Sequence, residues 1–498
     1  MNPNKIRQQL KNVNLEDENQ FPLFVHKLII EKFRSIEKLS IVFIHPLTVI
    51  TGTNKIGKSS ILAMLACSHV EFQMRDLSTG TLKRCTWNRL IKFTKFDQQL
   101  SDWKYKIKYK IGKRIEEKEG KRSALTKKWS GVAKKESQIE HKKVVYIDID
   151  RITPAHACSN VLFTNAQTSG SSISLDPRVG KYFEYIFETP FDLAQISKHQ
   201  NRTSYKLNNT FTSFNSASGE DVILSILLDS VQADKKSLIL IDELELGLHP
   251  NIQRRLVEVL MDISLKDHKQ FIVTTHSPFL LSSFEQKSRV FIEKKEDGKY
   301  HSISKISVNV AFSKMDSQIF PLLNLFCEDK ESVRLINKTL ESLKNKGHKD
   351  IHRIINIIPS GAASHVKENY DVFKRTWGFS KINIGFSAVF DGDQRTGYSS
   401  LIGADDKITF LFSSESPEKF LLSNYLKSYP NVKLTYHLNN SPHNILFNKC
   451  IEESIATSED EVFNKLYNQI LSNIDFKNWC LEFEEFLLES CVYFSEKL

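Results

Sequence analysis

Short apolar runs separated by polar segments predict two α/β regions in this chain. In the first region, the runs that predict strands lie at residues 24–30, 39–43, 47–50, 144–148, 238–241 and 271–275. In the second region, the corresponding runs lie at residues 322–327, 354–358, 384–390 and 408–412. Helical apolar spacing fills the gaps between strands of the second region, which predicts a small parallel sheet.

These patterns divide the 498 residues into four parts. We predict a polar N-terminal arm over residues 1–20, a first domain over residues 21–312, a smaller second domain over residues 313–435 and a helical C-terminal region over residues 436–498. Within the first domain we expect a basic insertion near residues 101–143 and a helical lobe near residues 155–235. Residues 31–36 are expected to form a turn, and the helix that includes residues 60–66 is expected to run past Cys67.

Residues 52–59 have the G-x-x-x-x-G-K-[ST] spacing of a phosphate-binding loop. An apolar run precedes them and a helical pattern follows, which is the context this motif needs. Backbone N–H groups of such a loop and the helix N-terminus attract a polyphosphate. We expect Lys58 to reach the outer phosphates of ATP and the Ser59 hydroxyl to hold Mg²⁺. The residues predicted to bind the nucleotide here are Gly52, Asn54, Lys55, Gly57, Lys58, Ser59 and Ser60.

Two carboxylates end the apolar run at residues 238–241. Asp242 is expected to bind the Mg²⁺ coordination sphere, and Glu243 to polarise an attacking water. The run at residues 271–275 leads to His276. An acidic pair at a strand end is more often a helix cap, and a lone histidine is more often structural. The occurrence of all these motifs in one order nevertheless indicates an ATPase site.

Acidic residues also follow strands of the second region. Glu328 ends one predicted strand, and Asp391 and Asp393 end another with Gly392 between them. Because the carboxyl ends of parallel strands meet at one edge of a sheet, we expect these side chains to converge. Hard oxygen ligands suit Mg²⁺ or Mn²⁺, which can activate water and stabilise a phosphodiester during cleavage. A simple polar turn at residues 391–393 is the alternative.

The charge of the chain favours a polyanionic partner. Lys and Arg number 69 against 59 Asp and Glu, and the sequence pI is about 9.0. Residues 101–143 hold 15 of these basic residues and 6 acidic ones, and lysines alternate with apolar residues over residues 104–111. One interpretation is a solvated hairpin. The other is a nucleic-acid-binding insertion that uses Tyr105, Tyr109 and Trp129.

The seven cysteines form no C-x-x-C pair, which favours reduced thiols in a cytosol. The first 20 residues lack the apolar core of a signal peptide. No apolar run approaches the length of a membrane span. We therefore expect a cytoplasmic protein without a membrane partner.

The order of motifs in the first region resembles the ABC-type ATPase heads of the SMC and OLD lineages. Residues 52–59 resemble the Walker A loop, Asp242 and Glu243 the Walker B motif with its catalytic glutamate, and His276 the switch histidine. Ser218 and Gly219 resemble the signature motif, although Ala217 stands where leucine is usual. Residues 245–250 resemble the D-loop region, and Arg151 an arginine that the family often keeps. The glutamine of the Q-loop is unassigned.

This resemblance implies that two heads enclose two ATP molecules. Ser218 and Gly219 of one subunit would contact the γ-phosphate bound by the Walker A loop of the other. The resemblance therefore implies a homo-oligomer, at least a dimer. A transporter ATPase also fits the motifs, but the second region does not resemble one.

The second region resembles a Toprim domain, so the whole chain resembles an OLD-family ATPase–nuclease. Many members of this family act in bacterial defence against phage, some with a partner such as a retron reverse transcriptase with its msDNA. Glu328 matches the first Toprim glutamate, and Asp391 and Asp393 match the D-x-D pair. Glu415 or Glu418 would supply the later acid. The family's E-G-x-x-E motif is altered here, because Asp329 replaces the glycine and the second acid is shifted to Glu331 or lost.

We therefore predict an ABC/SMC-type P-loop head followed by a Toprim-like α/β domain. The expected function is ATP-dependent cleavage of nucleic acid, with DNA favoured over RNA, in anti-phage defence. One alternative is an ATPase sensor whose Toprim domain is degenerate and whose partner, for instance a second nuclease, does the cutting. Another is an SMC-like ATPase that tethers DNA without cutting it.

Overall fold

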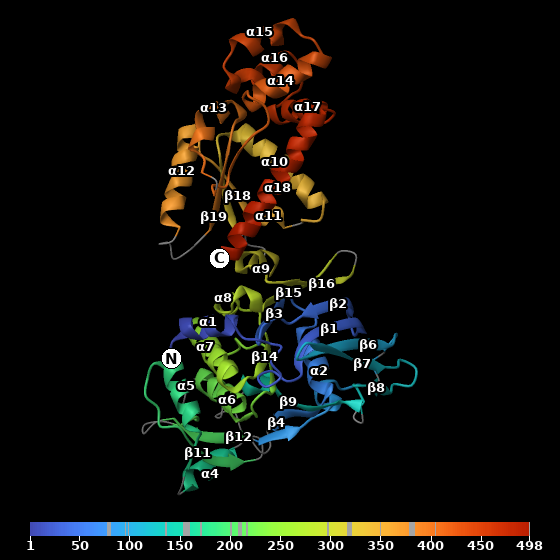
Figure 1. Cartoon of the computed structure of the whole chain (residues 1–498), viewed down its shortest axis with the longest axis vertical. Helices are drawn as coiled ribbons and strands as arrows, with labels where there is room; N and C mark the ends of the chain where they lie inside the picture. Colours follow the sequence, from blue (N-terminus) through green and yellow to red (C-terminus); the bar gives the residue numbers. More distant parts are fainter. Residues whose placement is uncertain are drawn as a thin grey trace. The chain divides into compact units, whose positions relative to one another are not determined.

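The computed structural model divides the chain into two compact units (Figure 1), Met1–Ala311 (unit 1) and Phe312–Leu498 (unit 2). The structure describes residues 1–76, 81–94, 96–97, 99–134, 137–152, 160–169, 172–199, 202–207, 212–215, 218–295, 298–315, 321–348, 350–377, 384–403 and 405–497. Each unit is described by itself below. None of the helices that the described residues form combines the length and the apolar character needed to cross a bilayer.

The larger sheet of unit 1 has the strand order β16-β15-β3-β14-β13-β9-β4-β5. Its strands are β3 (Leu47–Gly52), β4 (His69–Asp76), β5 (Thr81–Arg84), β9 (Ile139–Ile147), β13 (Leu238–Ile241), β14 (Gln270–Thr274), β15 (Arg289–Lys294) and β16 (Tyr300–Ser304). The six strands from β15 to β4 pair in parallel, and the outermost strands β16 and β5 pair antiparallel. Every residue of β3, β13 and β14 is buried, as expected for central parallel strands that are covered on both faces.

The second sheet of unit 1 is antiparallel and has the order β2-β1-β6-β7-β8. Its strands are β1 (Phe24–Phe33), β2 (Ile36–Val42), β6 (Trp103–Ile111), β7 (Arg114–Arg122) and β8 (Trp129–Gly131). The predicted turn over residues 31–36 is too long. Phe33 and Ile36 are buried and pair across the hairpin, which leaves only Arg34 and Ser35 in the turn. Arg34 has a φ of 52°, the left-handed value that such a tight connection needs.

The helices of unit 1 are α1 (Pro3–Lys11), α2 (Lys58–Cys67), α3 (Trp87–Leu90), α4 (Asn160–Thr168), α5 (Pro177–Phe187), α6 (Ser218–Gln232), α7 (Pro250–Asp267) and α8 (Pro278–Ser283). Helix α9 (Val308–Met315) includes the last residues of unit 1 and the first of unit 2. Helix α2 ends at Cys67 rather than beyond it. The Ser68 hydroxyl donates to the carbonyl of Met64, and β4 begins at the next residue. The expected arm over residues 1–20 contains α1, whose Ile6 and Leu10 are buried.

The predicted helical lobe is in fact mixed. Besides its helices it contains a three-stranded antiparallel sheet of β10 (Ile173–Ser174), β11 (Ala194–His199) and β12 (Arg202–Lys206). These strands are short and rich in polar residues, so they lack the apolar alternation that identifies a strand in a sequence.

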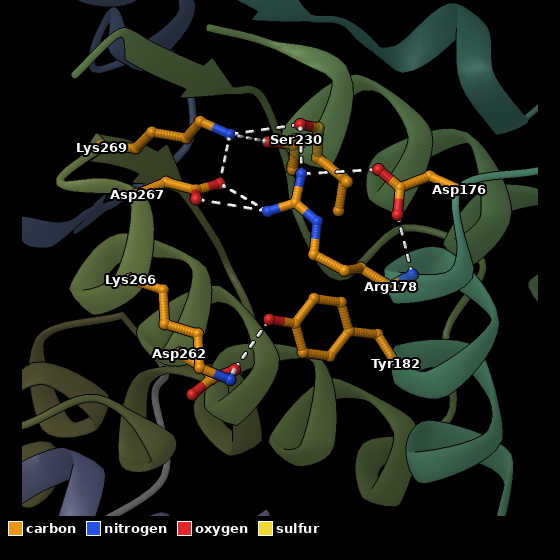
Figure 2. Close-up of polar contacts among 9 residues, drawn as sticks. Asp176, Arg178, Tyr182, Ser230, Asp262, Lys266, Asp267 and Lys269 are labelled. Atoms are coloured by element: carbon orange, nitrogen blue, oxygen red, sulfur yellow. Dashed lines mark hydrogen bonds and ion pairs between the residues drawn. The ribbon is translucent and has the colours of Figure 1, made fainter. Parts of the chain in front are cut away.

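A buried polar network joins α5 to the C-terminal ends of α6 and α7 (Figure 2). The Lys269 ammonium donates to the Ser230 carbonyl at 2.8 Å and to the Asp267 carboxylate at 2.8 Å. The Arg178 guanidinium donates to both oxygens of the same carboxylate at 3.2 Å. The Lys269 side chain is fully buried, so its three donors depend on these partners.

Unit 2 is built on a parallel sheet with the order β18-β17-β19-β20. Its strands are β17 (Leu323–Cys327), β18 (Ile355–Pro359), β19 (Gly385–Phe390) and β20 (Ile408–Phe410). Its helices are α10 (Lys330–Asn345), α11 (Ile351–Ile354), α12 (Ala363–Thr376), α13 (Arg395–Tyr398), α14 (Pro417–Ser428), α15 (Val432–Asn440), α16 (Leu446–Glu452), α17 (Glu459–Ile470) and α18 (Ile474–Lys497).

Helix α18 of the helical C-terminal region packs onto this sheet, whereas α15, α16 and α17 pack against α14 and one another. Helix α18 runs beside β19 and β17 (Figure 1). A Cβ atom at Gly385 would lie 2.5 Å from the Phe494 ring, so glycine permits the close approach of helix and strand. The Trp479 indole N–H donates to the Phe410 carbonyl at 3.2 Å. Helix α18 therefore completes the core of unit 2.

Replacement of Lys269 by Met should destabilise unit 1 by about 3 kcal/mol, because it leaves the carbonyl of Ser230 and the Asp267 carboxylate with fewer donors in a buried site. Lys266→Met is the matched control, since Lys266 also pairs with an aspartate but is 63% exposed. We expect the control to lose less than about 1 kcal/mol. Urea denaturation of the full chain measures both values, and equal losses would contradict the assigned role of the buried network.

Candidate functional site

A cavity of about 520 Å³ lies where β3, β13 and β14 end. It brings together four segments of the chain, residues 34–35, 55–60, 242–243 and 276. Its lining comprises Arg34, Ser35, Lys55, Ile56, Gly57, Lys58, Ser59, Ser60, Asp242, Glu243 and His276. Most of the residues predicted for the ATPase site therefore share one cavity. The predicted Asn54 is exposed and is not part of the lining, and the predicted Gly52 lies behind it.

Glycines shape the loop between β3 and α2. Gly52 has a φ of 150°, and a Cβ there would lie 2.3 Å from the Ile292 carbonyl oxygen of β15. Gly57 has a φ of 93° and directly precedes α2, and a Cβ there would lie 2.6 Å from the Ile36 side chain. Both positions therefore exclude a side chain, which keeps the loop close to the sheet.

Lys58 lies at the first turn of α2 with its ammonium turned back over the loop. It donates to the carbonyls of Gly52 at 3.0 Å and of Thr53 at 3.2 Å. Burial lowers the pKa of Lys58 to about 8, although Glu243 acts in the opposite direction. A polyphosphate in the cavity would supply negative charge beside this desolvated cation, and the N-terminus of α2 adds a favourable dipole.

Asp242 is held by two neighbouring strands. The Thr274 hydroxyl at the end of β14 donates to its Oδ1 at 2.6 Å, and the Tyr146 hydroxyl of β9 donates to its Oδ2 at 3.3 Å. Arg151 is buried behind the strand end and donates to the backbone carbonyl of Asp242 at 2.8 Å and to that of Glu243. The carboxylate is thereby fixed as an acceptor that faces the phosphate loop.

Glu243 follows with a φ of 47°, which is unusual for a residue other than glycine. Its backbone N–H donates to the Thr274 hydroxyl at 2.8 Å, which helps to hold this conformation. Burial and the neighbouring Asp242 raise the pKa of Glu243. A carboxylate with raised basicity at the cavity wall has the character of a general base.

His276 lines the same cavity from the end of β14. Its backbone N–H donates to a Glu245 carboxylate oxygen at 2.5 Å. Burial and the nearby Lys58 lower the pKa of His276, so its ring is neutral at pH 7. A neutral imidazole can donate one hydrogen bond and accept another at the position of the outer phosphate.

Of the predicted signature residues, the structure describes Gly219, which is not part of the lining of this cavity. Gly219 lies in the first turn of α6 against the D-loop region, where an added Cβ would lie 3.1 Å from the Gly247 carbonyl oxygen. Ser218 is the first residue of α6, and Ala217 lies outside the described residues, as does the side chain of Ser218.

Sequence reasoning missed several residues that build the site. Arg34 and Ser35 line the cavity, and the Arg34 guanidinium donates to the Ser60 hydroxyl at 3.4 Å. A basic residue in a short turn between two buried strands was the available signal. Thr274 carries no such signal, since a threonine at a strand end is ordinary. No described glutamine lines the cavity, so the Q-loop stays unassigned.

The carboxyl ends of adjacent strands β17 and β19 bring two predicted acids together in unit 2. The Asp391 backbone N–H donates to Glu328 Oε1 at 2.7 Å, and the Ser332 hydroxyl donates to Asp391 Oδ1 at 2.6 Å. Burial, followed by the charge of Glu328, raises the pKa of Asp391 to about 8. Burial raises the pKa of Glu328 to about 7. The two acids therefore share a desolvated volume.

Asp393 differs from the expected arrangement. Asp391 is buried, but Asp393 is exposed and accepts a hydrogen bond from the Gln394 amide at 3.1 Å. Gly392 does not serve to turn both carboxylates inward. A Cβ there would lie 2.3 Å from the Ser413 carbonyl oxygen, so the glycine permits close contact between two chain segments.

Asp329, which replaces the family's glycine, caps α10. Its Oδ1 accepts from the backbone N–H groups of Glu331 at 2.9 Å and Ser332 at 3.0 Å. Burial raises the pKa of Glu331 to about 7 although Arg334 pairs with it. Asp329 therefore adds both a helix cap and a negative charge to this edge.

Glu418, not Glu415, is the later acid that reaches this region. Glu418 is buried at the start of α14, and burial raises its pKa, whereas Glu415 is exposed. The described residues contain no group of three or more His, Cys, Asp or Glu side chains arranged to hold one metal ion. The carboxylate oxygens of Glu328 and Asp391 are ligands that suit Mg²⁺, but in this structure they do not form a complete metal-binding site.

The β6 lysines of the basic insertion do not form a free cationic face. The β6 lysines 104, 106, 108 and 110 form ion pairs with glutamates, and Lys106 and Lys108 share Glu117 of the adjacent strand β7. Tyr105 and Tyr109 are buried, and the Trp129 ring stacks on Trp87 at 4.1 Å. The structure therefore favours a solvated hairpin and excludes these two tyrosines as a stacking platform for bases.

Comparisons with known proteins agree with an ATPase in unit 1. Residues 92–282 match the model of a family described as an AAA domain, putative AbiEii toxin, Type IV TA system. The match begins after the phosphate loop and includes Asp242, Glu243 and His276. The retron Vc95 probable ATPase of Vibrio cholerae serotype O1 biovar El Tor is 25% identical over 187 residues, 34% of this chain and 35% of that protein. The chain thus matches about a third of this relative's length.

Solved structures of SMC heads are also similar. The SMC head domain from Thermotoga maritima is 13% identical with a TM-score of 0.35, and the similarity covers 57% of this chain and 99% of that one. The SmcHead bound to the C-winged helix domain of ScpA is 16% identical with a TM-score of 0.38, covering 56% of this chain and 97% of that one.

Without divalent cations, the free energy of unfolding should fall as the pH rises from about 4 to about 8. The reason is that the pKa of Asp391 in the folded chain, about 8, exceeds the ordinary aspartate value near 4, so the folded state binds more protons. Asp391→Asn should flatten this dependence and exceed wild type in stability at pH 9. Calorimetry of the full chain in EDTA, over a range of pH values, measures this dependence of the free energy of unfolding on pH. The exposed Asp475→Asn is the control, and the assignment fails if Asp391→Asn retains the wild-type slope.

Proposed function

We propose that this chain is an ATPase of the OLD type whose ATP cycle controls an acidic, nuclease-like edge in a second domain. The observation that carries the ATPase assignment is the single cavity that joins Lys58, Asp242, Glu243 and His276. The similarity of residues 92–282 to AAA-type ATPases supports it independently.

In this proposal the loop after β3 binds the phosphates of ATP. Lys58 would exchange its two backbone carbonyl partners for phosphate oxygens, a short movement because its ammonium already lies over the loop. Ser59 and Asp242 would hold Mg²⁺, which supplies positive charge to the phosphates. Glu243 would orient and deprotonate the attacking water, and His276 would donate a hydrogen bond to the outer phosphate.

The signature residues Ser218 and Gly219 would act across a dimer. Gly219 does not line the cavity of its own chain, as expected of a residue that completes the site of a partner subunit. A second copy would therefore be needed for hydrolysis.

For unit 2, we propose cleavage of a phosphodiester in nucleic acid, DNA rather than RNA, at the edge formed by Glu328, Asp391 and Asp393. Mg²⁺ or Mn²⁺ bound there would supply Lewis-acid chemistry. The buried carboxylates favour this proposal, since a cation would offset the burial and the neighbouring negative charges that raise their pKa values.

A second function fits the same unit. Asp329 in place of glycine, the exposed Asp393 and the absence of a three-ligand group among the described residues favour a degenerate Toprim domain. The chain would then be an ATPase sensor with a partner effector, such as a reverse transcriptase with its msDNA or a second nuclease. Similarity to a retron ATPase supports a role in cytoplasmic anti-phage defence. Nothing structural favours an SMC-like tethering role over these two.

Glu243→Gln should bind ATP with near wild-type affinity but hydrolyse it at least about 100-fold more slowly, because the amide cannot accept the proton of the water. The variant should accumulate as a dimer when ATP is present. Lys58→Ala should instead lose ATP binding. Phosphate release and analytical ultracentrifugation measure these properties, and undiminished hydrolysis by Glu243→Gln would refute the ATPase mechanism.

Asp391→Asn decides between the nuclease and the sensor. Under the nuclease proposal, this variant should lose Mg²⁺- or Mn²⁺-dependent cleavage of labelled DNA while its ATP hydrolysis persists. Asp475→Asn, an exposed aspartate on α18, should cut like wild type. Equal cleavage by wild type and Asp391→Asn, after repeated purification to exclude contaminating nuclease, would place the chemistry elsewhere. Absence of cleavage in wild type, even with its partner present, would establish the sensor.

A further inference from the structure

Unit 2 carries a groove that the proposed function does not use. The groove has a volume of about 560 Å³ and runs along α18, and Lys407, which precedes β20, also lines it. The Lys407 ammonium lies 5.0 Å from the centre of the Tyr493 ring. We call this surface the α18 groove.

The floor of the α18 groove is apolar. Leu481, Leu488 and Val492 line it at spacings of seven and four residues, so they form one stripe along the helix. Leu481 and Val492 are each 56% exposed. The stripe spans eleven residues, or about 16 Å, which is three turns of helix. Its length and spacing match the apolar face of another helix laid alongside.

The rim of the α18 groove is acidic. Glu485 and Glu489 are exposed, lie one helical turn apart, and make no hydrogen bond or ion pair with any described residue. Glu484 in the same lining is already engaged, because Ser342 and Lys346 donate to it. In a chain with a formal charge of +10, these two glutamates outnumber Lys407, the one basic residue among the described residues that line the groove, and favour a cationic partner for the apolar stripe.

A second copy of this chain fits the α18 groove poorly. Antiparallel contact between two α18 helices would bring Glu485 and Glu489 of both copies together. Like charges at such distances destabilise an interface.

We propose that the α18 groove binds an amphipathic helix of a partner protein, with leucine-like side chains on the stripe and lysine or arginine beside Glu485 and Glu489. The occupant is defined by this chemistry alone. The inference is independent of whether unit 2 cuts nucleic acid, since none of the groove residues belongs to the acidic edge.

A labelled synthetic helix tests this directly. The probe is a peptide of about 16 residues with leucines on one face and lysines on its flanks, and the control peptide has the same composition in scrambled order. Fluorescence anisotropy with the full chain, without nucleotide, measures the dissociation constants. We expect the amphipathic peptide to bind at least about tenfold more tightly than the scrambled one, and more weakly as salt increases.

Matched variants identify the surface. Val492→Asn should weaken binding about fivefold through lost apolar contact, whereas Ile474→Asn, which is 73% exposed on α18 outside the groove, should change it less than about twofold. Glu485→Gln combined with Glu489→Gln should weaken binding similarly and reduce its salt dependence. Glu482→Gln, an exposed glutamate of α18 that does not line the groove, should have little effect.

Three results would overturn the proposal. The first is equal binding of the scrambled peptide, which would indicate attraction to acidic surface in general. The second is equal weakening by groove and control variants, or no binding at all. The third is concentration-dependent self-association of the wild type without nucleotide that Val492→Asn abolishes, which would show that a second copy occupies the groove. Circular dichroism confirms that each variant retains the wild-type helix content.

Discussion

The hydrogen bond between Thr274 and Asp242 is the contact on which the candidate ATPase cavity depends. It joins the ends of the parallel strands β14 and β13, and the same threonine hydroxyl accepts the backbone N–H of Glu243. Arg151 holds the carbonyls of both acidic residues from behind. Thr274 of β14 and Tyr146 of β9 thus hold the Asp242 carboxylate from the two strands that flank β13, and Thr274 also holds the unusual backbone of Glu243. The order of strands in the sheet therefore positions the site.

In unit 2, too, the order of strands in the sheet positions two acidic side chains, but no basic side chain of the described residues is bonded to them. The ends of β17 and β19 bring Glu328 and Asp391 together, but the donors that reach them are the backbone N–H groups of Asp391 and Ala363 and the Ser332 hydroxyl. No lysine or arginine is bonded to either acid among the described residues. Because Glu328 and Asp391 are buried and have no basic partner in the described part of the chain, their pKa values are raised and protons neutralise their charge. The charge of Asp329 adds to this effect. A divalent cation would compete with those protons.

The sequence predicted what depends on local pattern. Central parallel strands are apolar throughout and the phosphate loop has fixed spacing, so β3, β9, β13, β14, the strands of unit 2 and Lys58 could be placed. The strands β4, β5, β15 and β16 of the larger sheet were not predicted. Arg34 and Thr274 were missed because their roles arise from contacts across strands. The small sheet β10–β12 was missed because its strands are short and polar. Asp393 was misplaced because spacing along the chain does not reveal which side chain faces the solvent.

Charge pairing within the sheet changes how the positive excess is presented. Nearly all of that excess lies in residues 101–143, and antiparallel pairing places Glu117 beside Lys106 and Lys108, which neutralises part of it on the β6 face. The acidic α18 groove, in a chain that is basic overall, shows the converse. A partner responds to the charges left uncompensated after folding, and cross-strand pairing decides which these are. Counts of charged residues therefore predict the solubility of a chain better than the place where its partners bind.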